Sequence, residues 1–397
     1  FLLHRHWGMM KAEERNTFSP RFSLDAIKLS DTFCNGRYNM CRTVPVGIAG
    51  GWEKRPFHFR PCFATMRRMI EGNDEKPILV SGVKPTGRPH VGNYFGAMKQ
   101  FVDLQDTYQS FVFIANYHAL TTVHDSAALS RDSLEMALDY LAIGLDPEKT
   151  TLFLQSDVPE VTELAWIFNC ITTMPYLSRA HAYKDAIAKG EEAGVGTFAY
   201  PMLMAADILI QDADVVPVGQ DQKQHVEMAR DTAEKFNRLF GETFKIPESL
   251  ILEDVKTVPG IDGRKMSKSY GNIISLFAEP EEIKKQVMAI VTDSKSPDEP
   301  KDHATCNVFA LHRLFSGSYL ADIEKRYREG GMGYKESKEI LIEHMEKFIA
   351  PLRARRKALA TDEGRVRQIL KNGGEIARER AHAKMQIIRK NSGLIIT

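Results

Sequence analysis

The sequence predicts an α/β fold, in which a doubly wound parallel sheet is followed by a mostly helical C-terminal domain. Three observations lead to this prediction. Short apolar, β-branched runs alternate with helix-like periodicity from residue 76 to residue 240. The first run is followed directly by a turn that contains glycine, as at the ligand-binding end of such sheets. After Asn272 the pattern is almost wholly helical.

Each predicted strand is a short apolar run, and each predicted helix is a longer stretch with apolar residues spaced by helical turns. The strands are predicted at 78–81, 111–115, 151–155 and 215–218, and the helices from Tyr94 and at 130–143, 161–173, 177–211 and 221–240. Ligands bind at the carboxyl ends of parallel strands. The segments 83–93, 116–122 and 155–159 therefore form one candidate crevice. A stretch rich in Pro, Asp and Lys at 294–302 is predicted to be an exposed loop.

The composition excludes membrane and fibrous classes. The chain has 397 residues, of which 43% are hydrophobic and 26% charged, and no apolar run reaches the length of a membrane span. The five cysteines are scattered without a CxxC pair, so we expect reduced thiols, no structural metal and a cytoplasmic location. They are Cys34, Cys41, Cys62, Cys170 and Cys306.

Both ends of the chain are basic. Residues 1–68 hold 12 Lys or Arg against 5 Asp or Glu, begin with Phe, and carry no periodic apolar pattern. We expect the natural start at Met66 or Met69, which makes residues 1–65 translated upstream sequence or a tag-like extension. A transit peptide is the competing interpretation, because the segment is rich in Arg, and its five acidic residues count against that.

Residues 351–397 hold 12 Lys or Arg against 4 Asp or Glu, in a helical pattern. Such a surface suits a nucleic-acid backbone, and the densest cluster is Arg353, Arg355, Arg356 and Lys357. A basic helix face that only meets solvent remains an open alternative.

Two short segments indicate ATP chemistry. In the first, 85–93, His90 lies near Gly87 and Gly92 where a strand turns into a helix, a natural place for phosphate. In the second, 265–269, Lys265 and Lys268 alternate with small hydroxyl residues after a glycine turn, which suits a loop that neutralises a polyphosphate.

Taken together with other segments, these two resemble the bacterial type of tryptophanyl-tRNA synthetases, a family of class I aminoacyl-tRNA synthetases. The matching segments are 81–87, 90–94, 144–149, 200–209, 216–225 and 265–269, and the resemblance runs from about residue 77 to the C-terminus. It implies a Rossmann-like ATP and tryptophan catalytic domain at 69–275 and a helical tRNA-binding domain at 276–397, with 1–68 a non-native or disordered extension. It also implies activation of L-tryptophan by ATP with Mg²⁺ carried by ATP, transfer to tRNA(Trp), and a homodimer.

The resemblance assigns roles to individual residues. It makes His90, Lys265, Lys268 and Lys184 catalytic. The residues it assigns to ATP are Pro85, Thr86, Gly92, Asn93, Gly219, Gln220, Asp221, Lys265, Met266, Ser267, Lys268 and Ser269. Lys84 joins them only because of its location beside the first segment. The resemblance assigns Asp207 and His118 to tryptophan. The residue pattern adds Tyr200, Met204, Val216 and Val218 around the ring, for which core packing is the alternative interpretation. By sequence alone, Lys184 is a surface lysine, and the Gly219 segment can equally be a helix cap.

The chemistry of Asp207 is the most specific part of this assignment. Asp207 is predicted on a helix among apolar residues, where a carboxylate needs a hydrogen-bond donor, and an indole N–H is a fitting one. Met204 shares its helix face. Pairing with a nearby lysine, or exposure to water, is the alternative.

The sequence departs from the family pattern at three positions: Asn93 replaces a His, as the family commonly permits, Gln220 stands where Glu is expected, and Lys84 replaces a Gln. The competing functions are a tyrosyl-tRNA synthetase, which shares both ATP signatures, a catalytically idle RNA-binding synthetase paralogue, and a nucleotidyltransferase of another class. The segment 200–207 disfavours the first, and the intact lysines and glycines disfavour the second.

Overall fold

A computed structural model describes residues 76–396 except 86, 189–193, 220–221 and 252–257. Its centre is a parallel sheet of five strands in the order β3-β2-β1-β4-β5. The strands are β1 (Ile78–Val83), β2 (Gln109–Ile114), β3 (Thr150–Leu154), β4 (Val215–Pro217) and β5 (Glu248–Leu250). The strand order reverses direction at β1, so the predicted doubly wound sheet is confirmed.

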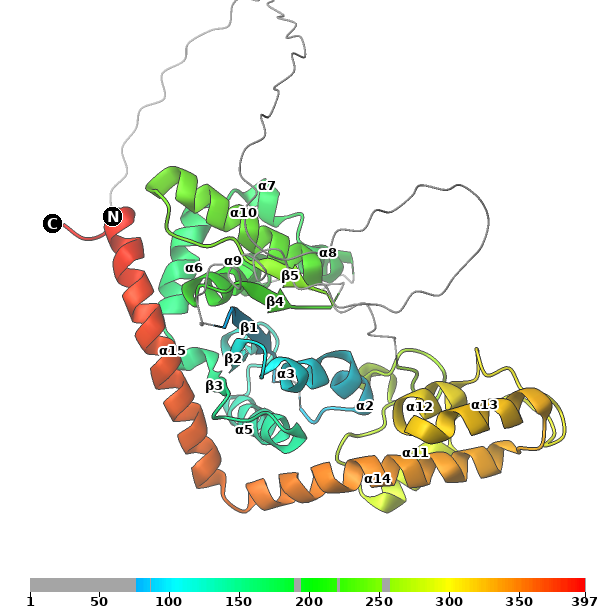
Figure 1. Cartoon of the computed structure of the whole chain (residues 1–397). Helices are drawn as coiled ribbons and strands as arrows, with labels where there is room; N and C mark the ends of the chain where they lie inside the picture. The colour runs from blue at the N-terminus through cyan, green and yellow to red at the C-terminus, as the bar shows by residue number, and fades with distance from the viewer. Residues whose placement is uncertain (1–75, 86, 189–193, 220–221, 252–257, 397) are drawn as a thin grey trace, which may run out of the picture. The chain divides into compact units, whose positions relative to one another are not determined.

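Helices connect and cover the strands (Figure 1). Between β1 and β5 they are α2 (Val91–Asn93), a π-helical turn (Tyr94–Met98), α3 (Lys99–Leu104), α4 (Asn116–Ala119), α5 (Ser126–Ile143), the 3₁₀ turn η2 (Gln155–Asp157), α6 (Glu160–Ile171), α7 (Met174–Leu177), α8 (His181–Ala188), α9 (Val195–Ile210) and α10 (Lys223–Phe240). After them come η4 (Lys268–Tyr270), α11 (Pro280–Met288), α12 (Asn307–Phe315), η5 (Gly317–Tyr319), α13 (Leu320–Glu329), α14 (Tyr334–Ala360) and α15 (Glu363–Asn391). The predicted helical C-terminal region is therefore present.

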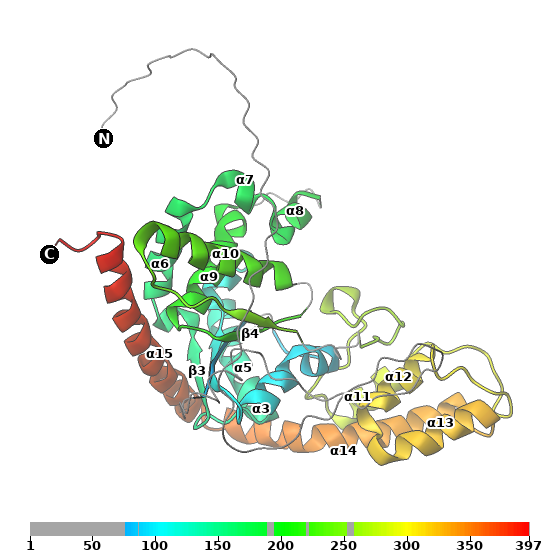
Figure 2. The ribbon, with the colours of Figure 1, turned by 45° about the horizontal axis from the view of Figure 1, so that its top comes forward.

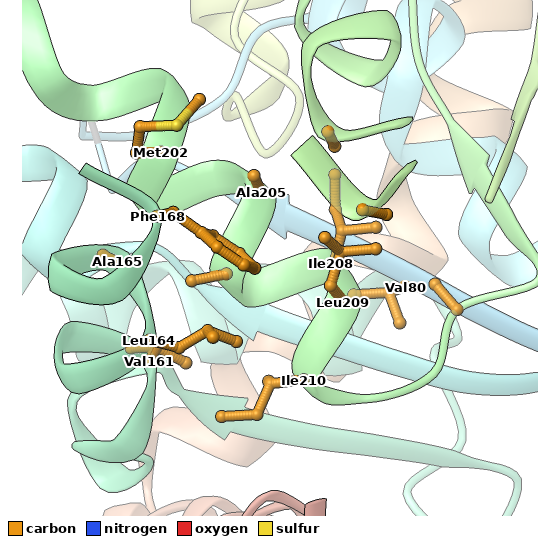
Figure 3. Close-up of a cluster of buried hydrophobic side chains, with 14 of the residues drawn as sticks. Val80, Val161, Leu164, Ala165, Phe168, Met202, Ala205, Ile208, Leu209 and Ile210 are labelled. Carbon is orange, nitrogen blue, oxygen red and sulfur yellow. The ribbon is translucent and has the colours of Figure 1, made fainter. Parts of the chain in front are cut away.

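The strands bury both faces, because side chains alternate between the two sides of a sheet. Phe111 and Phe113 of β2 join one core, which α6, α9 and α10 cover, whereas Val112 and Ile114 join a second core under α5. Figure 3 shows the first core, in which Phe168 of α6 lies among apolar side chains of α9.

The last helix, α15, contributes to both cores. Its first turns pack Val366 and Leu370 on the α5 side, and its later turns pack Ala381 and Met385 on the α6 side. Between them Gly373 lies so close to the edge strand that a Cβ would be 2.0 Å from the Leu152 carbonyl oxygen. The glycine therefore lets the helix backbone approach β3, as Figure 2 shows for the helix as a whole.

Charged side chains of α14 dock this helix onto α5. Arg356 donates from Nε to Asp139 at 2.5 Å and also binds Glu135, while Arg355 donates to the Ala142 carbonyl at 3.1 Å. Arg353 is buried and binds Glu346 and the Ala278 carbonyl.

The sequence-based interpretation of this cluster was therefore wrong for Arg353 and Arg356. They are neither an open surface for a nucleic-acid backbone nor a solvated face, because their partners lie within the chain. Arg355 is exposed apart from its bond to the Ala142 carbonyl, so for this residue the prediction is not overturned. Lys357 is exposed and pairs with Glu279 at 2.6 Å.

Some predicted elements differ in detail. The helix predicted at 177–211 is divided into α8 and α9, which starts only at Val195, and the short strand β5 carried no apolar signal. In the predicted exposed loop Lys301 is 4% exposed, because its amine donates to the Ser296 and Glu299 carbonyls. The predicted extension at 1–68 lies outside the described residues. None of the helices in the described ranges is long and apolar enough to cross a membrane.

Candidate active site

The candidate site lies at the carboxyl ends of β1, β2 and β3. The backbone N–H of Ala115 donates to the Val83 carbonyl at 2.9 Å, and the side chains of Asn116 and Ser156 share a hydrogen bond of 2.8 Å. The three segments predicted to form one crevice are therefore adjacent in space.

His90 is the N-cap of α2. Its Nδ1 accepts from the backbone N–H of Asn93 at 3.2 Å, and the Asn93 side chain accepts from the His90 backbone at 3.1 Å. Because Nδ1 is an acceptor, the proton of the neutral ring lies on Nε2. Burial, and secondarily the charge of Lys268, lower the pKa of His90 to about 4. At neutral pH the imidazole is a neutral N–H donor.

Gly92 joins this turn to the second predicted ATP segment, 265–269, which we call the lysine loop. A Cβ on Gly92 would lie 3.0 Å from Nδ1 of His90 and 3.3 Å from Cβ of Met266, so only a glycine fits without a shift. Backbone hydrogen bonds extend the contact, since Val91 donates to Ile274 at 2.9 Å and Leu276 donates to Pro89 at 3.1 Å. The two ATP signatures are thus packed against each other.

The lysine loop is held by Asn272, which is 2% exposed. Its Oδ1 accepts from the Ser267 backbone at 2.8 Å, and its Nδ2 donates to Asp262 at 2.7 Å and to the Lys265 carbonyl at 3.1 Å. Met266 is buried and anchors the middle of the loop. The loop therefore has a defined base from which its lysines project.

Lys268 lies beside the first signature, since a Cβ on Gly87 would be 3.7 Å from its Nζ. Lys268 is exposed by surface area, yet the surrounding protein lowers its pKa by desolvation. The hydroxyls of Ser267 and Ser269 share a hydrogen bond of 2.9 Å, and Lys265 is exposed. An anion in front of His90 would therefore meet the lysine loop.

Asp207 lies at the other end of the crevice and is 4% exposed. Its Oδ2 is 3.0 Å from Nε2 of His118, and Nε2 of Gln155 donates to Oδ1 at 2.9 Å and to Oδ2 at 2.8 Å. Burial raises the pKa of Asp207, and the hydrogen bonds from His118 and Gln155 oppose that shift. The predicted need for donors is therefore met partly within the chain.

The remaining residues assigned to tryptophan lie on the helix of Asp207, α9, on α4 beside it, or at the core that α9 covers. The hydroxyl of Tyr200 binds the ring nitrogens of His225, which in turn contacts Oε1 of Gln222 at 2.9 Å. The ring of Tyr200 also meets that of His118 edge to face at 5.9 Å. Val216 is buried in the adjoining core, and Met204 and Val218 are partly buried against it.

Several predicted residues lie elsewhere or cannot be placed. Lys84 donates to Thr121 at 3.1 Å, on the His118 side of the crevice, and burial lowers its pKa. Lys184 is exposed on α8, a helix that contributes none of the contacts described above for His90 and Lys268. Pro85 is buried, while Asn93 and Gly219 are exposed. Thr86, Gln220 and Asp221 lie outside the described residues.

Sequence reasoning missed three residues of the site: Gln155, Asn272 and His225. Gln155 stands directly after a predicted strand, within a segment assigned to the crevice, and this position was the available signal. Asn272 belongs to no pattern whose spacing reveals its partners. His225 ends the matching segment 216–225 but was given no role there, because the contacts of both residues form only in the folded chain.

A hollow of about 550 Å³ adjoins the site on the side of α4 and α6. His118 and Tyr200 line it together with Thr121, Leu120 and Trp166. Leu120 is 49% and Trp166 69% exposed. This apolar surface therefore begins at residues that also contact Asp207 or its neighbours.

Comparison with known proteins identifies what the chain is similar to. A family model described as "tRNA synthetases class I (W and Y)" matches residues 72–350. The tryptophan–tRNA ligase of Rhodopirellula baltica is 50% identical over 317 residues, which cover 80% of this chain and 99% of that protein. The tryptophan–tRNA ligase of Fusobacterium nucleatum is 48% identical over 318 residues, with 80% and 98% covered.

A solved structure gives the same result. The tryptophanyl-tRNA synthetase of Campylobacter jejuni, complexed with ADP and tryptophan, is 46% identical, with a TM-score of 0.75, and the match covers 80% of this chain and 99% of that one.

Proposed function

This chain belongs to the class I tRNA synthetases, among the tryptophan–tRNA ligases, and from this premise we propose that its crevice binds ATP beside His90 and tryptophan beside Asp207. The enzyme activates L-tryptophan with ATP to the adenylate and transfers the tryptophanyl group to the terminal adenosine of tRNA(Trp). AMP and pyrophosphate are released. The observation that supports the site assignment best is the packing of the two ATP signatures through Gly92.

On the ATP side, the chain supplies charge and hydrogen-bond donors rather than a nucleophile. The carboxylate of tryptophan attacks the α-phosphorus, and pyrophosphate leaves with its Mg²⁺, which arrives bound to ATP. Nε2–H of His90 donates to a phosphate oxygen, and Lys265 and Lys268 neutralise the charge that grows on pyrophosphate. A neutral His90 suits this role, because it donates without a proton equilibrium near neutral pH.

We assign Lys184, Gly219 and its neighbours Gln220 and Asp221 to the nucleotide only through the family pattern, and Lys84 only through its location. Lys84 lies close to His118, because its amine binds Thr121, whose hydroxyl donates to the His118 carbonyl at 2.8 Å. Contact with the carboxylate or the α-phosphate, where the two substrates meet, fits this position best.

On the tryptophan side, Asp207 accepts from the indole N–H. Its Oδ2 already accepts two hydrogen bonds, whereas Oδ1 accepts one, from Gln155. A carboxylate oxygen accepts about two, so Oδ1 has room for the indole. Met204, Val216 and Val218 supply apolar walls for the ring.

We propose tRNA(Trp) as the macromolecular partner, with its backbone against exposed cations of the C-terminal region. Since Arg353 and Arg356 of α14 are engaged by carboxylates within the chain, the candidates are exposed Arg355 and, on α15, exposed Arg365, Arg367 and Lys371. Arg367 pairs with exposed Glu363 at 3.1 Å, a contact that phosphate can replace at little cost.

We also propose a cytoplasmic homodimer. The apolar surface that follows His118 is its contact, because Leu120, Trp166 and Val195 are 49%, 69% and 82% exposed and a twofold contact buries the same residues of both subunits. Light scattering at micromolar concentration should report a dimer, and Trp166→Glu should shift it to a monomer. A monomeric wild-type protein would overturn this part.

The test of the function is amino-acid-dependent exchange of pyrophosphate into ATP, run with each of the twenty amino acids. Exchange should depend on tryptophan and on Mg²⁺, and charging of tRNA(Trp) should follow. Exchange with tyrosine instead of tryptophan would support the rival synthetase, and no exchange with any amino acid would support an idle paralogue.

A further inference from the structure

We propose that Gln155 is a specificity-determining positioning residue: it orients Asp207 and keeps it an anion, so that the carboxylate presents Oδ1 to the indole N–H. This inference rests on the proposed function and names a residue that neither ATP signature nor the tryptophan segment contains. It starts from the hydrogen bonds of one buried amide.

The orientation of the Gln155 amide is fixed by the backbone of α4. Its Oε1 accepts from the N–H of Tyr117 at 3.0 Å and from the N–H of His118 at 3.2 Å. Two N–H donors require an oxygen at that position, so the NH₂ group lies on the opposite side. That side is occupied by Asp207.

The NH₂ group of Gln155 can only donate, and it contacts both carboxylate oxygens at 2.9 and 2.8 Å. Both residues are buried, at 1% and 4% exposed. Burial raises the pKa of Asp207, which favours a neutral carboxylic acid, and donors favour the anion. Gln155 is a donor whose charge does not change with pH.

Ionisation of Asp207 matters for recognition of the ring. A carboxylate accepts at every lone pair, whereas a protonated acid carries one O–H donor that faces an indole N–H unfavourably. By holding both oxygens from one side, Gln155 also fixes the plane of the carboxylate. The remaining acceptor position of Oδ1 then has a defined direction, which discriminates a ring with an N–H from one without it.

Gln155 further couples this recognition to His118. One amide binds the α4 backbone through oxygen and Asp207 through nitrogen, while the His118 side chain returns to the same carboxylate at 3.0 Å. The three residues form a closed set of contacts. A shift of Gln155 would therefore displace both groups that face tryptophan.

The sharpest test is Gln155→Glu, which keeps the shape and replaces the NH₂ group by a titratable oxygen. At high pH two carboxylates then touch in a buried site. At low pH the pair takes up one proton, and the introduced carboxyl group can again donate to Asp207 while its other oxygen accepts from α4. Among the described residues, titratable groups on the elements near the pair include Tyr117 and His118 on α4, Tyr200 on α9, His225 on α10 and Asp157 on η2, and they are the same in both proteins.

The expected result is that the ratio of KM for tryptophan in the Gln155→Glu variant to that in the wild type depends on pH. In pyrophosphate exchange, KM for tryptophan should be raised at least ~30-fold at pH 8 and should return to within about threefold of wild type at pH 5.5. KM for ATP should stay within about twofold of wild type. A ratio that does not change with pH would overturn the proposal.

Gln105→Glu is the matched control. Gln105 is also buried, and it likewise donates to a carbonyl, that of Gly144, and accepts from a backbone N–H, that of Asp146. Its replacement should lower the melting temperature without a pH-dependent KM for tryptophan. The same pH dependence in both variants would overturn the proposal, because it would come from a buried carboxyl anywhere in the fold.

Gln155→Met covers the case in which the Glu variant fails to fold. It removes the donor without adding a charge, so tryptophan binding, measured by equilibrium dialysis, should weaken at every pH. Preference for tryptophan over its benzothiophene analogue, which lacks the N–H, should also decrease. Unchanged binding and preference would overturn the proposal.

The wild type separates this inference from the proposed function. If the wild type shows no exchange with tryptophan, the proposed function itself is wrong. If the wild type does show this exchange and the Gln155 variants behave in the same way, this inference alone is wrong.

Discussion

The ion pair that docks α14 onto α5 makes a quantitative prediction for Arg356→Met. Asp139 has a side chain 1% exposed, its Oδ1 is 2.5 Å from Nε of Arg356, and its Oδ2 has no hydrogen-bond partner among the described residues. Burial raises the pKa of Asp139 from its ordinary 3.8 to about 6, although Arg356 opposes that change. This change in the pKa of Asp139 corresponds to roughly 3 kcal/mol of free energy against the ionised form in the folded chain.

The sign of the pH dependence follows from this raised pKa. The folded chain binds the proton of Asp139 more tightly than the unfolded chain, so the favourable contribution is full below about pH 4 and is lost as the pH rises through about 6. Without Arg356 the buried carboxylate loses the cation that opposes the effect of burial most strongly, and its pKa rises further. At pH 8 the variant should lose about 3–5 kcal/mol of unfolding free energy, as for other broken buried pairs.

At pH 5 Asp139 is mainly protonated in both proteins, and the loss should shrink to about 1 kcal/mol from the contact with Glu135. Urea unfolding followed by circular dichroism at both pH values measures the two differences. Arg365→Met, an exposed change on α15, is the control and should cost less than about 0.5 kcal/mol. Equal losses for Arg356→Met at pH 5 and pH 8 would refute the reasoning.

Three further outcomes are expected. Asp207→Asn loses the anion that accepts from Gln155 and the indole, so kcat/KM for tryptophan should fall by a factor that corresponds to about 2–4 kcal/mol of transition-state stabilisation. Unchanged exchange would contradict the assignment of Asp207 to the tryptophan pocket. Lys268→Ala should reduce pyrophosphate exchange steeply and leave tRNA affinity, measured by filter binding, within about twofold, and an equal loss of both contradicts the division of roles. Gly373→Ala places a Cβ 2.0 Å from the Leu152 carbonyl oxygen and should lower the melting temperature clearly, in contrast to Gly364→Ala at the exposed start of α15.

The sequence predicted the sheet because its strands are buried on both faces. Runs such as 111–115 are apolar throughout, and this local signal needs no knowledge of the remaining fold. The strand β5 was missed because its residues Glu248–Leu250 are only partly buried at the edge of the sheet. Its pairing with β4, rather than its composition, makes it a strand.

The site was predictable where chemistry demands a residue type at a short spacing. His90, Gly92 and the lysine loop meet this condition. Gln155 and Asp207 are 52 positions apart, and nothing in one sequence pairs them. Arg356 of α14 shows the opposite error, because a basic run in isolation does not reveal that Asp139 and Glu135 lie opposite it. Charge counts along a chain therefore predict a binding surface poorly until the partners of each charge are known.

The position of α15 has a consequence for how the chain is made. Synthesis proceeds from the N-terminus, so the residues of β3 and most residues of both cores have been synthesised long before Gly373 and Met385 leave the ribosome. Until then the outer edge of β3 is an unprotected strand, and the apolar ends of two cores are open to water. A nascent chain that stalls before residue 373 would expose the edge of β3, whose unpaired backbone groups can form hydrogen bonds with strands of other chains. Chaperones and proteases would meet such a chain as a folding intermediate, although its ATP signatures had already been synthesised.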